Sequence, residues 1–143
     1  MFTSFGYFED PDDDLRFLRG VRRALVPGGR LVLDFLNQAH VRANLVAQTE
    51  LQAGTLRLHV ERRIEESGPG GACVLKHVRA VDARTGALSS EYEERVRLYT
   101  AEELDALLGE AGFKLVGERL GDLAGASFEP DSPRLVRVAQ RGP

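Results

Sequence analysis

The first regular pattern in the chain is an amphipathic helix followed by an apolar strand. Apolar residues recur every three or four positions over residues 12–25, with aspartates at the start and Arg22 and Arg23 near the end. Carboxylates stabilise the N-terminal end of a helix and cations its C-terminal end, so this spacing predicts a helix over 12–25. The PGG sequence at 27–29 ends it. The run RLVLDFLN, residues 30–37, is apolar at both alternating sets of positions, which predicts a strand buried on both faces.

The middle of the chain changes to a period of two. Residues 38–54 are mixed in character and are predicted to be partly helical. Apolar and polar side chains then alternate over about 56–64 and 73–82 and in a third stretch that ends at Tyr99. The turn sequences SGPGG and RTG separate these stretches. The pattern therefore predicts a three-strand antiparallel meander that occupies residues 55–99.

The last part of the chain returns to a helical pattern and then to strands. Thr100 and Glu103 have the T-x-x-E spacing of a capping box, and apolar residues follow at helical spacing until Gly112. This predicts a helix that begins after Thr100 and ends before Gly112. FKLVGERL, residues 113–120, and RLVRVAQR, residues 134–141, are further strand candidates.

The composition predicts one soluble, cytoplasmic domain over residues 1–143. Hydrophobic residues make up 43% of the chain and charged residues 29%, which is an ordinary globular balance. Aspartates from Asp10 onward interrupt the apolar N-terminus too early for a secretory leader, and no apolar run is long enough for a transmembrane helix. A net charge of -3 argues against a nucleic-acid-binding protein. The single Cys73 has no cysteine to pair with and is predicted to be a packing residue.

Two segments are placed where ligands of open α/β sheets bind, just beyond the carboxyl ends of strands. The stretch Phe2–Phe8 precedes the first helix and looks like the continuation of a strand. Its small residues and aromatic rings suit the edge of a ligand site, although core packing explains the aromatics equally well. Asn37 follows the buried strand, and His40 lies one helical turn further on.

Polar residues of the meander and the N-terminal aspartates give weaker signals. His59, His77, Arg97 and Tyr99 are candidate site residues, but alternating His and Arg is also typical of a solvated strand face. The three histidines have no metal-ligand spacing. The aspartates at residues 10–14 lack the spacing of a calcium loop, and helix capping explains them better.

The order of the segments resembles that of class I S-adenosylmethionine-dependent methyltransferases. Residues 2–37, with ALVPGGRLVLDF, resemble the part of that family between the end of the fourth strand and the fifth strand. RVRLYTAEELDALLGEAGFKLV, residues 95–116, resembles the helix leading to the sixth strand, and SPRLVRVAQR, residues 132–141, resembles the seventh strand. The resemblance implies an α/β fold, the C-terminal portion of a Rossmann-like methyltransferase sheet, with the three-strand meander as an insertion.

The same resemblance implies an incomplete domain. The family holds its cofactor with a Gly-rich loop after its first strand and an acidic residue after its second, and the chain has no G-x-G-x-x-G sequence between a strand and a helix. We therefore expect a truncated, split or misassigned product whose full-length form transfers a methyl group to an unidentified acceptor, a small molecule. The alternative is a noncatalytic half-domain that pairs with a separately encoded N-terminal half or with itself.

The resemblance also assigns roles to the candidate site residues. The implied cofactor is S-adenosyl-L-methionine, and the residues expected at its edge are Met1, Phe2, Thr3 and Ser4. The residues expected to contact the acceptor are Tyr7, Asn37, His40, Arg97 and Tyr99. No metal ligands are expected.

Overall fold

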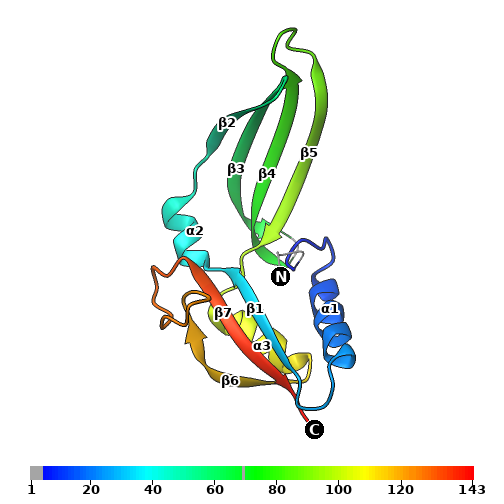
Figure 1. The fold of residues 1–143 in the computed structure, drawn as a ribbon, viewed down its shortest axis with the longest axis vertical. Helices are drawn as coiled ribbons and strands as arrows, with labels where there is room; N and C mark the ends of the chain where they lie inside the picture. The colour runs from blue at the N-terminus through cyan, green and yellow to red at the C-terminus, as the bar shows by residue number, and fades with distance from the viewer. Residues whose placement is uncertain (1–4, 69) are drawn as a thin grey trace.

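A computed structural model describes residues 5–68 and 70–143 of the chain, in which two antiparallel sheets are joined end to end (Figure 1). We call the sheet β1–β7–β6, together with α1 and α3, the body. We call the sheet β2–β3–β4–β5, which projects away from it, the blade. The elements in chain order are α1 (Pro11–Ala24), β1 (Arg30–Leu36), α2 (Gln38–Asn44), β2 (Gln48–Ala53), β3 (Leu56–Gly68), β4 (Gly71–Asp82), β5 (Leu88–Arg97), α3 (Ala101–Glu110), β6 (Phe113–Leu120) and β7 (Arg134–Arg141).

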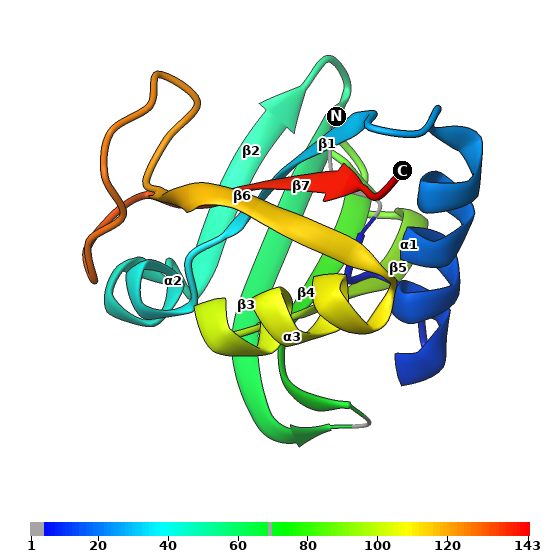
Figure 2. The same cartoon turned by 90° about the horizontal axis from the view of Figure 1, so that it is seen from below.

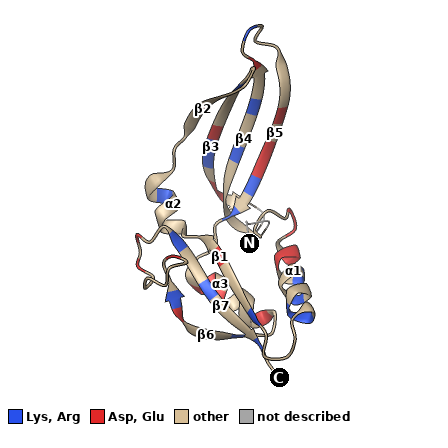
Figure 3. Ribbon diagram, viewed as in Figure 1, with Lys and Arg blue, Asp and Glu red and all other residues tan. Residues whose placement is uncertain are grey.

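Helix α1 forms where the charge pattern predicts it, one residue earlier at each end. The Asp10 carboxylate caps the helix by accepting a hydrogen bond from the Asp12 N–H at 2.9 Å. Pro11 follows at the first helical position, where a missing N–H costs nothing. Figure 3 shows the acidic start and the basic end of the helix, the distribution that its dipole favours.

The core of the body lies between its sheet and the helices α1 and α3 (Figure 2). Leu33 and Phe35 of β1 share one face with Leu135 and Ala139 of β7, which are their neighbours in the antiparallel register. The apolar faces of the two helices cover these side chains. The helix and sheet residues that are buried most deeply in this cluster are Leu18, Phe35, Leu104, Leu108, Leu135 and Ala139.

The prediction that β1 is buried on both faces is wrong, because the face of the body sheet opposite the core is exposed at β1. Val32 lies opposite Val138, which lies opposite Val116, so three valines form a row across the sheet. This row is not part of the core, and Val32 is 53% exposed. β1 also pairs only with β7 among the described residues. One face and one edge of this apolar strand are thus left uncovered by residues 5–68 and 70–143.

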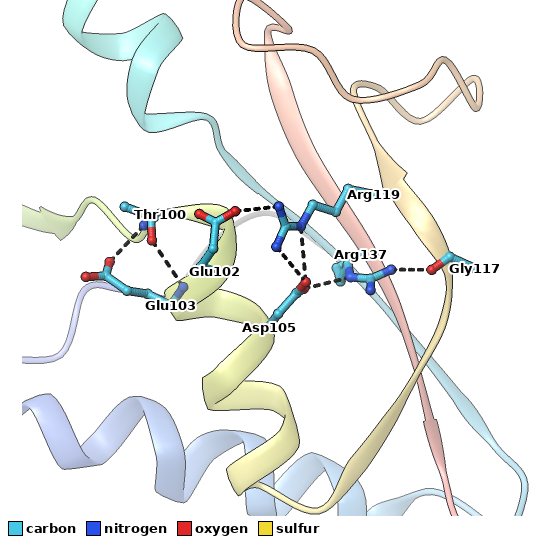
Figure 4. Close-up of polar contacts among 7 residues, drawn as sticks. All are labelled: Thr100, Glu102, Glu103, Asp105, Gly117, Arg119 and Arg137. Carbon is cyan, nitrogen blue, oxygen red and sulfur yellow. Dashed lines mark hydrogen bonds and ion pairs between the residues drawn. The ribbon is translucent and has the colours of Figure 1, made fainter.

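Helix α3 begins at a capping box and is fixed to the body by a partly buried ionic network (Figure 4). The Thr100 hydroxyl accepts from the Glu103 N–H at 3.1 Å, and the Glu103 carboxylate accepts from the Thr100 N–H at 2.8 Å. Asp105 accepts hydrogen bonds from Arg119 of β6 at 3.1 Å and from Arg137 of β7 at 2.7 Å. One carboxylate therefore ties the helix to two strands, as Figure 4 shows.

The blade contains four strands, not three, because part of the mixed segment joins it. The segment predicted to be partly helical forms α2 and then β2, which pairs with β3 from Gln48 opposite Glu61 to Ala53 opposite Leu56. The three strands predicted over 55–99 therefore share their sheet with a fourth strand, β2, which precedes them. In the blade, Val60 of β3 and Val78 of β4 are buried side by side on one face.

Candidate functional site

The predicted cofactor-edge residues Met1, Phe2, Thr3 and Ser4 lie outside the described residues, and the segment that follows them packs against the body. Phe5 is 1% exposed and packs edge-on against Phe35, with a ring-centroid distance of 5.5 Å. Gly6 has φ +86°, and an added Cβ there would lie 3.2 Å from the Phe35 ring. The Gly6 carbonyl accepts a hydrogen bond from the Arg97 N–H at 2.9 Å. The chain just before α1 is therefore packed against both β1 and the base of β5.

A buried ion pair holds this segment in place. Asp14 of α1 is fully buried, and one of its oxygens accepts hydrogen bonds from Arg97 Nη1 at 2.7 Å and from the Tyr99 hydroxyl at 2.6 Å. Its other oxygen accepts from the Gly6 N–H at 3.0 Å. Arg97 Nη2 also donates to the Glu9 carbonyl at 3.0 Å. Asp14 therefore joins α1, the segment before it and the end of the blade.

The surroundings of this carboxylate change the chemistry of Tyr99. Burial, followed by the hydrogen bond to Asp14, raises the pKa of the Tyr99 phenol well above its usual range. Tyr99 thus remains a neutral hydrogen-bond donor. Arg97 is 2% exposed, and its Nε has no hydrogen-bond partner among the described residues. Two of the five residues predicted to contact the acceptor, Arg97 and Tyr99, are thus brought together, but around the buried Asp14.

The other predicted site residues lie apart from this cluster. The Tyr7 side chain is 40% exposed. Asn37 caps α2 and is 4% exposed, and its amide donates to the carbonyls of Pro130 at 3.0 Å and Ser132 at 2.7 Å. Asn37 therefore connects the end of β1 to the loop before β7. His40 lies in α2 and lines a cavity at the base of the blade.

This cavity has a volume of about 350 Å³ and lies between α2, the loop after it and the strands β2 and β3. Val41, Leu45 and Val46 form its apolar wall, and Thr49 and Arg62 of the blade face them. The volume is within the range of small-molecule sites. It lies immediately beyond the C-terminal end of β1, where the sequence predicts ligand binding.

The remaining candidates behave as a solvated strand face. His59 lies 3.5 Å from Glu50, and His77 lies 2.8 Å from Glu91, which also pairs with Arg79. Among residues 5–68 and 70–143, no group of three or more His, Cys, Asp or Glu side chains is arranged to hold a metal ion. In the same part of the chain, no helix has the length and apolar character needed to cross a membrane. Cys73 is buried, and this burial raises the pKa of its thiol.

Asp14 and Arg62 were missed by the sequence interpretation. The assignment of all the N-terminal aspartates to helix capping is wrong for Asp14, because its side chain, although in the first turn of α1, is buried and accepts hydrogen bonds from Arg97 and Tyr99. A signal existed: Asp14 precedes Leu18 by four residues and Val21 by seven, so it falls within the apolar stripe. Arg62 had no comparable signal, since its position on β3 does not reveal the cavity that α2 forms beside it.

Comparison with solved structures shows which proteins share this fold. A S-adenosylmethionine-dependent methyltransferase from Clostridium acetobutylicum ATCC 824 matches 99% of the chain with a TM-score of 0.76 and 14% identity. The CcbJ methyltransferase of Streptomyces caelestis matches 97% with a TM-score of 0.71 and 24% identity. The chain has the fold of part of a methyltransferase. DesVI of Streptomyces venezuelae also matches 97%, with a TM-score of 0.59 and 16% identity.

The match covers only part of each solved protein. The chain spans about half of their length, 56%, 53% and 55% respectively. No protein-family model and no curated protein sequence matches the chain. At these identities the similarity concerns the fold, which agrees with the resemblance seen in the sequence.

Proposed function

We propose that this chain forms the acceptor-side portion of a S-adenosylmethionine-dependent methyltransferase that acts on a small molecule. The observation that carries the proposal is the fold, which matches solved methyltransferases over 97–99% of the chain. The order of sequence segments that resembles the same family supports it independently. In this proposal the body is the C-terminal portion of a Rossmann-like sheet, and the blade is an insertion.

In this proposal the described residues hold only part of the cofactor. In the described part of the chain, the glycines with positive φ lie in turns such as Gly28, between a helix and a strand, and Gly54, between two strands. Neither has the strand-to-helix context of a nucleotide-binding loop. In the proposal the main cofactor contacts come from a part of the protein outside this chain, and Met1–Ser4 contribute only an edge.

In this proposal, the chain contributes to catalysis by positioning the reacting groups. Methyl transfer is an in-line displacement, and much of its acceleration comes from holding the two reacting groups in line in a dry site. The Asp14 cluster fixes the backbone of the Phe5–Glu9 segment through the Gly6 N–H and the Glu9 carbonyl. The adjacent Tyr7 is proposed to face the transferred methyl group. The cavity beyond β1, with His40, is proposed to face the acceptor.

Calorimetric titration with S-adenosylmethionine tests this proposal. The DNA upstream of Met1 is first read for a segment that encodes a strand followed by a Gly-rich loop and a helix. The 143-residue chain and the longer product are then titrated in parallel. We expect saturable binding by the longer product alone. Binding by the 143-residue chain would show that its own residues suffice for the cofactor, and no binding by either would overturn the proposed activity.

The uncovered edge and face of β1 favour a second candidate, a noncatalytic half-domain that pairs with a separate N-terminal half or with a second copy. An apolar strand with an open edge is a template for further pairing. Light scattering after size exclusion measures self-association directly. Val32→Lys places a charge on the valine row, whereas Val26→Lys changes a turn residue that is 71% exposed. Dissociation of a dimer by Val32→Lys alone would support this candidate, and a monomer at all concentrations would exclude self-pairing.

A further inference from the structure

The cavity at the base of the blade combines an apolar wall with a charged group. Val41, Leu45 and Val46 line it from α2 and the loop after it, and Arg62 lines it from β3; the cavity is open to solvent. Sites for small molecules are built in this way, with mostly apolar surface and a few polar groups that fix orientation. The volume of about 350 Å³ suits one small organic molecule rather than a macromolecular segment.

The Arg62 guanidinium is held by neutral partners only. Its Nη1 donates to the Thr49 hydroxyl at 3.0 Å and to the Val46 carbonyl at 3.5 Å. The neighbouring Arg42 differs, because Glu66 neutralises it with two hydrogen bonds at 2.5 Å and 2.9 Å. No carboxylate of the described residues lines the cavity. The cavity therefore has a positive charge that no acidic side chain among its described lining residues offsets, on a fork suited to a planar anion.

His40 adds a polar side chain on the α2 side of the same cavity. The Asn44 amide nitrogen lies 3.4 Å from His40 Nδ1 and donates to the His40 carbonyl at 2.9 Å. Both residues line the cavity. The cavity thus has one cation on the blade and a pair of polar side chains on the helix.

We infer that this cavity binds a small molecule with a planar anionic group, such as a carboxylate, on an apolar body. The anionic group contacts Arg62 and the apolar body lies against Val41, Leu45 and Val46. This inference rests on the proposed function in one respect only, which is that the bound molecule is the methyl acceptor. Binding itself requires neither the cofactor nor methyl transfer.

Benzoate is a suitable probe, and benzamide is its neutral counterpart of nearly the same shape. The 143-residue chain is labelled with ¹⁵N and titrated with each compound while amide chemical shifts are recorded, without S-adenosylmethionine. We expect saturable benzoate shifts confined to α2, residues 45–49 and Arg62, and at least tenfold weaker binding of benzamide. Equal affinities, or shifts spread over other surfaces, would overturn the inference.

Matched variants test whether the Arg62 guanidinium supplies the charge that binds benzoate. Arg62→Gln is compared with Arg63→Gln, because Arg63 is the next residue on β3, is exposed and points to the other face. We expect Arg62→Gln to raise the benzoate Kd at least tenfold and Arg63→Gln to change it less than twofold. Arg62→Lys keeps the charge without the fork and is expected to bind with intermediate affinity, which preserves the test if Arg62→Gln disturbs folding. A Kd unchanged in both Arg62 variants would refute the assignment.

These outcomes separate two failures. If benzoate binds through Arg62 but the longer product does not bind S-adenosylmethionine, the cavity assignment holds and the methyltransferase proposal fails. If the cofactor binds and benzoate does not, the acceptor is held elsewhere.

Discussion

Replacing Asp14 by asparagine tests the role of the buried ion pair most directly. Asparagine has nearly the same shape as aspartate, so Asp14→Asn removes the charge while it leaves the packing of α1 almost unchanged. Arg97, which is 2% exposed, then keeps a positive charge without a counter-ion in the protein interior. The hydrogen bonds from the Tyr99 hydroxyl and the Gly6 N–H lose their charged acceptor at the same time.

The expected loss of unfolding free energy follows from the burial of the Asp14–Arg97 ion pair. Removing one partner of a buried ion pair costs about 3–5 kcal/mol of unfolding free energy, because the other charge is left uncompensated. An exposed pair is worth about 0–1 kcal/mol. Asp13 provides the matched control one residue away, since it pairs with Arg16 at 2.5 Å on the surface. We therefore expect Asp14→Asn to destabilise the chain several times more than Asp13→Asn.

Urea unfolding monitored by circular dichroism measures both variants. Because small domains are stable by only about 5–15 kcal/mol, the loss expected for Asp14→Asn is a large fraction of the total, and a rescuing variant is measured beside it. The double variant Asp14→Leu/Arg97→Met removes both charges and is expected to recover most of the lost stability. Equal costs for Asp14→Asn and Asp13→Asn, or a double variant less stable than Asp14→Asn, would refute the reasoning.

Three further outcomes are expected. Thr100→Ala removes the capping-box hydroxyl and should lower the unfolding free energy by about 0.5–2 kcal/mol, whereas Thr100→Ser should retain most of it; equal losses in urea unfolding would contradict the cap. The pKa of Tyr99 is higher in the folded than in the unfolded chain. The stabilising contribution of Tyr99 is therefore present below about pH 10 and is lost as the pH rises towards the folded pKa. Alkaline unfolding should begin at lower pH in wild type than in Tyr99→Phe, after each curve is scaled to its neutral-pH stability. Cys73, buried and with a raised pKa, should react with a disulfide reagent at the rate of unfolding, and a fast reaction in native buffer would show that it is accessible.

The sequence predicts those elements whose signals are local. The N-terminal aspartates, the apolar stripe and the PGG turn place α1 within one residue, and the T-x-x-E spacing before α3 corresponds to a capping box with both hydrogen bonds. The strands β6 and β7 occupy the predicted ranges. In each of these elements the deciding residues lie within a few positions of one another in the chain.

The features that the sequence did not predict depend on long-range neighbours. β2 is a strand because it pairs with β3, although its own residues, QTELQA, show little of the alternation of a half-buried strand. The exposure of Val32 depends on which layers cover the body sheet, and this is not encoded in β1 itself. The candidate site follows the same rule, since the position of His40 after β1 placed it among the candidates, whereas Arg62 lines the cavity only because α2 lies beside β2 and β3.

The shape of the blade gives a practical means of presenting this protein on a sensor surface. Its β2–β3 turn at Gly54 and its β4–β5 turn at Gly86 lie at the end remote from the body, and a Cβ added at either glycine would meet no atom within 4 Å (Figure 1). Loop tips of this kind are the usual sites where insertions are tolerated. A biotin-acceptor sequence placed in the β4–β5 turn would immobilise the molecule by its far end. The cavity and the open edge of β1 would then remain accessible to analytes in flow.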